Sequence, residues 1–257
     1  MAENSKIQWT ENTWNPWQGC RKVSPGCKYC YMYRDKEKFG QDPTIVKRSN
    51  PATFNKPLTW KKPAMVFTCS WSDWFIQEAD EWRPEAWDII RRTPHLTYQI
   101  LTKRPERIAD NLPPDWGAGY PNVWLGVSAE DQDTFNLRVP ILTEILAAVR
   151  FLSLEPLLSK INFDHFFANG YLPDPLNKIN WVIVGGESGN NFGKWVYRPC
   201  KIDWIESIVY DCKDLKIPVF VKQLGTDLAR RYRLSDRHGG NIEEFPLPIR
   251  VRQFPNI

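Results

Sequence analysis

The chain has 257 residues and a formal net charge of +4 at pH 7, and its hydrophobic (42%) and charged (25%) fractions are those of a globular protein large enough to bury its own core. It contains no run of eighteen apolar residues, and its first residues show neither the apolar region of a signal peptide nor an Arg-rich amphipathic pattern. We therefore expect a cytoplasmic protein with no membrane partner, in which clustered cysteines bind metal more often than they form disulfides.

The first predicted feature along the chain is a cysteine loop, which follows a short candidate strand at residues 13–18. Its sequence, GCRKVSPGCKYCY, places Cys20, Cys27 and Cys30 within eleven residues. Three thiolates leave a tetrahedral metal site one ligand short, and the three histidines of the chain are remote in sequence. Three interpretations stay open here: a zinc site completed by a distant residue, a [4Fe–4S] cluster with one open iron, or a chance grouping of thiols.

Two segments are rich in basic residues. Residues 34–62 hold eight basic and three acidic residues with aromatic rings between them, and six arginines follow residue 226. A solvated surface is the commoner explanation of such segments, and phosphate binding is the alternative. The thirteen tryptophans are predicted to lie mostly in the core or in pocket walls, because aromatic side chains carry much of a core's burial energy.

Six apolar, β-branched runs begin at residue 64 and recur every 26 to 36 residues. They predict strands at 64–69, 96–101, 122–127, 150–155, 181–186 and 217–223. Helices are predicted at 82–92, 133–149 and 203–215, and Pro140 implies a late start or a kink in the second of these. Residues 159–180 contain prolines and no helical period, which predicts a loop insertion.

The alternation of strands and helices predicts an α/β fold, a (β/α) barrel or partial barrel with parallel strands. We expect this barrel domain to span residues 1–225, with the cysteine loop at 20–30. The remaining residues, 226–257, are expected to form an Arg-rich C-terminal extension packed on the barrel.

Polar side chains follow nearly every predicted strand, at the end where the strands of a barrel converge on an active site. In chain order these residues include Ser70, Asp73, Lys103, Arg104, Ser128, Glu130, Glu155, Glu187 and Lys222. Loops are polar in general, but an acid or a base after nearly every strand favours a functional mouth. The two carboxylates Glu155 and Glu187 also permit a hydrolase on a plain barrel, an alternative that leaves the cysteines unexplained.

The ending Cys27-Lys28-Tyr29-Cys30 resembles the cysteine–any–aromatic–cysteine ending of radical S-adenosylmethionine (SAM) enzymes. Six residues separate Cys20 from Cys27, where the usual pattern has three, and Pro25 with Gly26 offers a turn for the extra residues. Six ordered blocks resemble those of a phage-associated three-cysteine-motif family, radical-SAM-like and also labelled a domain of unknown function. They span residues 14–225 and are WNPWQGCRKVSPGCKYCY, LTKRPERI, VWLGVSAEDQ, RFLSLEPLL, WVIVGGESG and VFVKQLG.

The resemblance implies a partial barrel of the radical SAM type, with a [4Fe–4S] cluster on the three cysteines and SAM on the fourth iron. Reductive cleavage of SAM would give a 5′-deoxyadenosyl radical that acts on an unidentified substrate. An electron donor such as flavodoxin or ferredoxin is a further implied partner. The phage association and the basic segments favour a nucleic acid or a nucleotide as the substrate.

The resemblance also implies roles for the polar residues. SAM-binding roles fall on Ser70 and Asp73 (amino group), Lys103 and Arg104 (SAM carboxylate, or alternatively a substrate anion), Ser128 and Glu130 (ribose) and Tyr29 (adenine wall or cluster shield). Glu155, Glu187 and Lys222 are the candidate catalytic residues. The alternative function is a non-catalytic phage or host protein that binds zinc or an iron–sulfur cluster and uses its basic segments to bind nucleic acid.

Overall fold

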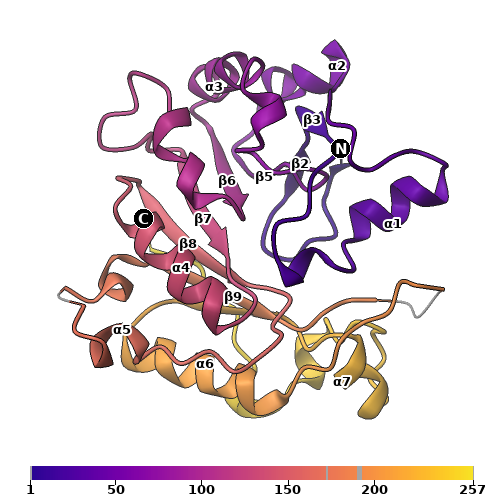
Figure 1. Cartoon of the computed structure of the whole chain (residues 1–257), viewed down its shortest axis with the longest axis vertical. Helices are drawn as coiled ribbons and strands as arrows, with labels where there is room; N and C mark the ends of the chain where they lie inside the picture. The colour runs from indigo at the N-terminus through magenta and orange to yellow at the C-terminus, as the bar shows by residue number, and fades with distance from the viewer. Residues whose placement is uncertain (1, 172, 190–192, 257) are drawn as a thin grey trace. The chain divides into compact units, whose positions relative to one another are not determined.

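The apolar runs of the sequence form strands in the computed structural model, which describes residues 2–171, 173–189 and 193–256 (Figure 1). Their positions agree with the predicted ranges to within two residues, because continuous apolar runs are typical of buried parallel strands. The strands are β5 (Ala64–Thr68), β6 (Leu96–Thr102), β7 (Val123–Ser128), β8 (Val149–Leu154), β9 (Trp181–Gly185) and β10 (Val219–Gln223). The earlier candidate strand is present as β2 (Asn12–Trp14) and β3 (Trp17–Gln18).

The chain forms two compact units, and the first consists of Met1–Val23, Met32–Val127 and Glu144–Val149. Its strand order is β1 (Ala2–Glu3), β2, β5, β6, β7, with β1 antiparallel to β2 and the other neighbours parallel. The pairing register puts Thr13, Phe67, Gln99 and Trp124 in one row, so these side chains share one face of the strands. A small antiparallel pair joins β3 to β4 (Lys47–Arg48).

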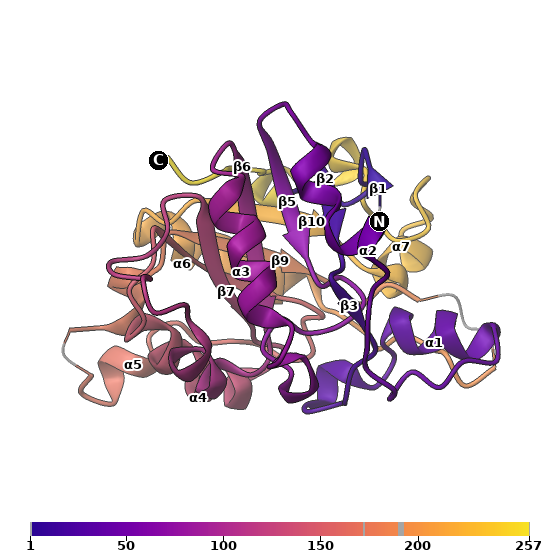
Figure 2. The same cartoon turned by 90° about the horizontal axis from the view of Figure 1, so that it is seen from above.

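Helices of the first unit are α1 (Tyr31–Lys38), α2 (Pro51–Phe54) and α3 (Arg83–Arg92). The predicted helix at 82–92 is therefore confirmed, and Pro84 lies in its first turn, where a missing N–H costs nothing. Figure 2 shows α3 in front of β6 and β7. The side chains of Trp87 and Ile90 are buried on its inner face.

Tryptophans form much of the first unit's core. The rings of Trp17, Trp74, Trp87 and Trp116 follow one another with centroid distances of 5.1, 5.0 and 5.6 Å. Tilted and edge-to-face contacts of this kind add to the burial energy of large aromatic side chains. Nine of the thirteen tryptophans are buried, which confirms that most of them belong to the core.

The second unit consists of Ser24–Tyr31, Ser128–Thr143 and Arg150–Ile257. Within it β8, β9 and β10 are neighbours and parallel. Its helices are α4 (Gln132–Thr143), α5 (His165–Ala168), α6 (Ile202–Asp214) and α7 (Thr226–Arg231). The predicted helix at 203–215 is α6, which packs on β9 and β10 and buries Ile205, Ile208 and Cys212 as its 3.6-residue period predicts.

The helix predicted at 133–149 differs from the observed α4 at its start and at its end. It has no late start, because the Asp131 carboxylate accepts a hydrogen bond from the Thr134 N–H (2.9 Å) and fixes the beginning of the helix. It ends at Thr143, three residues after Pro140, which cannot donate a helical hydrogen bond. Residues 144–149 leave the helix, and the Leu146 carbonyl accepts a hydrogen bond from the Trp116 indole (2.8 Å).

The loop prediction for residues 159–180 is correct only in part. This segment contains the single-turn helix α5, in which Phe166 is buried and stacks on Phe135 of α4 with ring centroids 5.3 Å apart. Burial of that one ring stabilises a turn of helix too short to show a period in the sequence. Short 3₁₀ helices occur at Pro25–Cys27, Lys56–Thr59, Gln77–Ala79, Pro105–Arg107, Ala109–Asn111, Pro175–Lys178, Ile242–Glu244 and Leu247–Ile249.

The residues after 226 pack on β10. The Val221 N–H donates to the Val251 carbonyl (3.0 Å), and the Gln253 N–H donates to the Val219 carbonyl (2.9 Å). A domain boundary at residue 225 stays a prediction. Strands and helices alternate, and neighbouring strands follow one another in chain order, which confirms the predicted α/β partial-barrel class. No helix of the described residues is long and apolar enough to cross a membrane.

Candidate functional site

In the first unit, the backbone around Cys20 is held on both sides. The Gly19 N–H donates to the Trp71 carbonyl (3.0 Å), and the Ser72 hydroxyl donates to the Gly19 carbonyl (2.6 Å). Gly19 has φ +94°, and a Cβ there would lie 2.2 Å from the Ile45 carbonyl oxygen. Only glycine therefore fits at this position, and the loop after β5 fixes the start of the cysteine loop.

A buried ion pair of Asp73 and Arg104 lies beside Cys20. Arg104 contacts the Asp73 carboxylate (3.0 Å), donates to the Arg21 carbonyl (2.8 Å) and reaches the Cys20 sulfur (3.9 Å). Burial lowers the pKa of Arg104, but Asp73 and the Cys20 sulfur outweigh it, so the net shift is upward. The guanidinium is a permanent positive charge next to the Cys20 thiol.

Both oxygens of the Asp73 carboxylate are already engaged by groups of the protein. Its Oδ1 accepts hydrogen bonds from the Thr102 hydroxyl (2.6 Å) and the Phe75 N–H (2.9 Å), and its Oδ2 accepts one from the Lys103 N–H (2.9 Å). Its side chain is 6% exposed. These contacts give Asp73 a positioning role, and contact with SAM stays a prediction.

Two further predicted residues lie in the same loops of the first unit. The Ser70 hydroxyl accepts a hydrogen bond from the Asn15 amide (3.0 Å), whose oxygen accepts the Trp71 N–H (2.8 Å). The Lys103 side chain is half-buried. Ser70, Asp73, Lys103 and Arg104 are thus brought together with Cys20 by the loops that follow β5 and β6.

In the second unit, the segment with Cys27 and Cys30 is seated on Glu130. The Ser24 hydroxyl donates to Glu130 Oε1 (2.8 Å) and lies 3.8 Å from the Cys27 sulfur. A Cβ on Gly26 would come within 2.3 Å of Glu130 Oε1, so the segment lies directly against this carboxylate. The side chain of Glu130 is completely buried.

Arg138 of α4 pairs with Glu130 from the other side. Its Nη1 donates to Glu130 Oε2 (3.0 Å) and to the Ser128 carbonyl (2.7 Å), and its side chain is 4% exposed. A buried charge is tolerated only when it is paired and hydrogen-bonded, and here each charge satisfies the other. Ser128 and Glu130, both predicted to contact ribose, therefore lie in a buried structural network, and ribose contact stays a prediction.

A second carboxylate–arginine pair reaches the same cysteine segment. The backbone N–H and Nε of Arg198 both donate to Glu187 Oε2 (2.8 Å each), and Nη2 donates to Oε1. The remaining nitrogen, Nη1, donates to the Pro25 carbonyl (2.9 Å), and the guanidinium lies 5.3 Å from the centre of the Tyr29 ring. Arg198 therefore ties the loop after β9 to the segment with Cys27 and Cys30.

Glu155 and Lys222 form a more accessible pair than Glu130–Arg138 or Glu187–Arg198. Lys222 Nζ is 2.8 Å from Glu155 Oε2, with side chains 24% and 12% exposed. A Cβ on Gly185 would lie 3.1 Å from that same Oε2, so the glycine at the end of β9 leaves the carboxylate its room. This pair is able to hold or move a proton at Lys222 Nζ.

The six cysteines divide into two groups of three. Cys20, Cys27 and Cys30 are half-buried, whereas Cys69, Cys200 and Cys212 are buried. Burial raises the pKa of Cys200 to about 12 and also raises that of Cys69 and Cys212, so these thiols stay protonated at neutral pH. The half-buried group therefore contains the more accessible of the thiols.

Within the described part of the chain, no group of three or more His, Cys, Asp or Glu side chains is arranged to hold a metal ion. Cys20 belongs to the first unit, while Cys27 and Cys30 belong to the second. Neither unit by itself contains the three thiolates that the sequence predicts as ligands.

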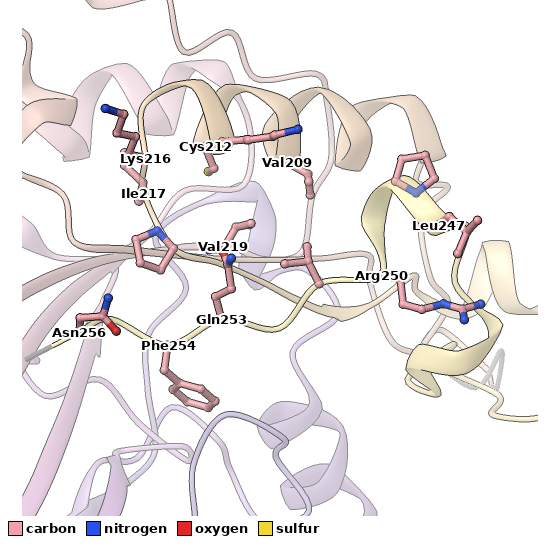
Figure 3. A pocket seen from close by; sticks show the side chains of 14 residues that line it. Val209, Cys212, Lys216, Ile217, Val219, Leu247, Arg250, Gln253, Phe254 and Asn256 are labelled. Atoms are coloured by element: carbon pink, nitrogen blue, oxygen red, sulfur yellow. Dashed lines mark hydrogen bonds between the residues drawn. The ribbon is translucent and has the colours of Figure 1, made fainter.

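A pocket of about 520 Å³ in the second unit lies apart from these residues (Figure 3). It is lined by α6, the start of β10 and the C-terminal segment, including Cys212, Leu247 and Phe254. The polar pair of Lys222 and Glu155 is at the opposite, carboxyl end of the strands, so the pocket does not belong to the candidate site.

Sequence reasoning missed three residues that help to build the site: Ser24, Arg138 and Arg198. Arg138 and Arg198 donate hydrogen bonds to carboxylates eight and eleven positions earlier in the chain. Neither spacing matches a helical or strand period, so the sequence pattern does not predict these pairs. The Pro25-Gly26 turn was noted as a turn, but its contact with Glu130 has no signal in the sequence.

A family model described as a protein of unknown function (DUF5131) matches residues 4–244, which is more than half of the chain. The chain belongs to the DUF5131 family. This agrees with the sequence blocks, which predicted a family labelled as a domain of unknown function. No curated protein matches this DUF5131 protein.

One similar solved structure is a variant of spore photoproduct lyase with bound AdoMet and dinucleoside spore photoproduct. Its TM-score against the DUF5131 protein is 0.47, with 11% sequence identity, over 71% of this chain. The DUF5131 protein covers 57% of the lyase chain, which is less than two thirds of its length.

Proposed function

We propose that this DUF5131 protein is a radical-SAM-type iron–sulfur enzyme. The observation that carries the proposal is the seating of its cysteine segments. In each unit, a segment with half-buried cysteines is held by a carboxylate–arginine pair whose carboxylate lies in a loop after a parallel strand. Residues at these strand ends form the active sites of (β/α) barrels.

The donor set fits an iron–sulfur cluster. Cys20, Cys27 and Cys30 lie within eleven residues of sequence, and thiolates are the ligands that such clusters take. Arg104, beside the Cys20 sulfur, supplies positive charge next to an anionic cluster. A cluster held by Cys20, Cys27 and Cys30 would supply, with SAM and one electron from a donor of the flavodoxin or ferredoxin class, the reductive cleavage of the sulfonium to methionine and a 5′-deoxyadenosyl radical.

The protein's own residues bind and position in this proposal. Ser70 and Lys103 are the first unit's candidates for SAM contact, because Asp73 is saturated by protein hydrogen bonds. Tyr29, held under the Arg198 guanidinium, is the candidate wall for adenine. Asp73 and Glu130 remain proposed SAM-binding residues. They also position the cysteine segments, Asp73 through Arg104 and Glu130 through Ser24.

Chemistry on the substrate is assigned to the second unit. Lys222 and Glu155 are half-buried and paired, which suits a group that holds a proton for the substrate after hydrogen abstraction. Both oxygens of Glu187 accept hydrogen bonds from Arg198. Glu187 therefore positions Arg198, which in turn contacts the segment with Cys27 and Cys30. The proposal also includes that the enzyme is phage-associated and cytoplasmic and that it acts on a nucleic acid or a nucleotide.

The test is anaerobic purification and cluster reconstitution, followed by iron and sulfide analysis. We expect about four irons and four sulfides per chain, and release of 5′-deoxyadenosine on incubation with SAM and dithionite. Cys30→Ala should abolish that release, while Cys212→Ala, which removes a buried thiol in the same unit, should retain it. An intact cluster that releases no 5′-deoxyadenosine would contradict the radical SAM assignment.

A non-catalytic protein that binds zinc or an iron–sulfur cluster and also binds nucleic acid is the second candidate, and the aromatic and basic residues between 193 and 204 favour its nucleic-acid binding. The same metal analysis separates the two functions. One zinc and no iron per chain, unchanged by anaerobic reconstitution, would replace the first proposal with this one.

A further inference from the structure

Basic and aromatic side chains alternate in the second unit next to the segment with Cys27 and Cys30. They come from the loop before α6 and from α7 with the residues after it. We call this set the Arg–aromatic surface, and it consists of Lys194, Trp195, Tyr197, Arg198, Arg230 and Arg233. Tyr197 and Arg198 are half-buried, whereas Arg230 and Arg233 are exposed.

Cations lie over aromatic rings in this surface. The Arg230 guanidinium is 5.6 Å from the centre of the Tyr197 ring, and the Lys194 ammonium is 5.2 Å from that of Trp195. Arg198 lies over Tyr29 in the same way, at 5.3 Å. A ring with a cation on it offers both a stacking face and a positive charge to a ligand.

The two segments are tied together. Arg231 donates to the Cys200 carbonyl (2.9 Å), and the Thr226 N–H donates to the Glu187 carbonyl (3.0 Å). Thr226 Oγ1 also accepts the Gly189 N–H (3.0 Å). The surface is therefore built in advance rather than assembled on a mobile tail.

Charge in these segments is predominantly positive. Residues 193–201 contain three basic residues and no acidic one, and residues 226–237 contain four arginines and two aspartates. Both aspartates are occupied, since Asp227 pairs with Arg231 and Asp236 accepts the His238 N–H (2.7 Å). Within the described residues neither Arg230 nor Arg233 is in an ion pair.

We infer that the Arg–aromatic surface binds single-stranded nucleic acid, with phosphates on Arg230 and Arg233 and a base stacked beside Tyr197. Alternating cations and rings track a flexible backbone and its bases, whereas α7 has only six residues and offers no helix for a duplex groove. Through Arg198 the surface adjoins the segment with Cys27 and Cys30. The inference rests on the proposed function for its conclusion that the bound strand is the substrate.

The test is fluorescence anisotropy of labelled 12-nucleotide single strands, DNA and RNA, and of the matching duplex, with the full chain and no SAM. Arg230→Ala/Arg233→Ala should weaken single-strand binding at least tenfold. The slope of log affinity against log salt should fall by about 1.4, since each phosphate contact to a single strand contributes roughly 0.7. Arg91→Ala/Arg92→Ala, an exposed arginine pair of α3 outside both basic segments, is the matched control and should leave the affinity within twofold.

Tyr197→Leu separates stacking from charge. It should weaken binding by about five- to a hundredfold without changing the salt slope, because stacking of a base on a ring carries no counterion release. Unchanged melting temperatures of the variants establish that the fold is intact. Equal loss in the two double variants, preference for duplex, or binding insensitive to Arg230 and Arg233 would each overturn the inference.

The binding assay is independent of SAM cleavage. A chain that binds the single strand but releases no 5′-deoxyadenosine contradicts the proposed function and supports the surface. A chain that cleaves SAM but binds no strand contradicts the surface alone. Failure of an acidic peptide to displace the bound single strand also supports nucleic-acid binding by the Arg–aromatic surface.

Discussion

Both units hold a cysteine segment with a buried carboxylate–arginine pair, but the member of the pair that lies next to the segment is the arginine in Asp73–Arg104 and the carboxylate in Glu130–Arg138. In the first unit the arginine of the pair, Arg104, reaches the sulfur of Cys20, and Asp73 lies behind it. In the second unit the carboxylate, Glu130, reaches the segment through Ser24 and packs under Gly26, while Arg138 lies behind.

This difference separates two tasks. A cation at 3.9 Å from a sulfur compensates the charge of a thiolate, which is an electrostatic role. A buried carboxylate that accepts a serine hydroxyl instead fixes the shape of the turn between Ser24 and Cys27. We infer that the first unit tunes the charge at Cys20 and that the second sets the geometry of the Cys27–Cys30 segment.

The largest expected effect comes from breaking either pair. Asp73→Ala and Glu130→Ala should each lower the free energy of unfolding by about 3–5 kcal/mol, because an arginine is left buried without its partner. In the metal-free protein, Glu130→Ala should speed iodoacetamide labelling of Cys27 and Cys30, and Asp73→Ala that of Cys20. Chemical denaturation and peptide mass spectrometry measure the two effects.

The control for these substitutions is Glu243→Ala, which removes an exposed carboxylate near Arg250. It should change the free energy of unfolding by no more than about 0.5 kcal/mol, as surface substitutions do. Equal labelling of all three cysteines in both variants would show that the units do not hold their cysteines separately.

A smaller effect tests the packing of Gly26 on Glu130. Gly26→Ala should cost about 1–3 kcal/mol, because its Cβ would overlap the buried carboxylate. In the Glu130→Ala background the same change should cost less than about 0.5 kcal/mol, since the obstructing side chain is gone. Equal costs in the two backgrounds, measured as a double-mutant cycle by urea denaturation, would contradict this account of the turn.

The smallest stability effect is expected at the Glu155–Lys222 pair. Glu155→Gln should cost about 1 kcal/mol or less, because the pair is partly exposed and its charges remain solvated. Thermal and urea unfolding measure the cost. A loss of about 3 kcal/mol, equal to that of the buried pairs, would make Glu155 a structural residue and remove it from the candidate catalytic residues.

Local sequence was sufficient to predict where the strands lie and which polar residues follow their carboxyl ends. The run WVIVGG predicts β9 because a buried parallel strand needs continuous apolar residues, and Glu187 follows it at once. The three clustered cysteines likewise stand out by spacing alone. Pro140 showed where α4 is weak, but the early start of that helix depends on an Asp131 cap that the pattern did not reveal.

Only the tertiary structure decided which charges meet. Arg104 lies 84 positions from Cys20, and Glu130 lies 106 positions from Ser24, so no local period links them. Which of several acids and bases after the strands are buried in pairs, and which stay accessible like Lys222, follows from how the loops pack. The sequence by itself determined the strands and the cysteine spacing, because these depend on neighbouring residues, whereas long-range packing assigned each polar residue its partner.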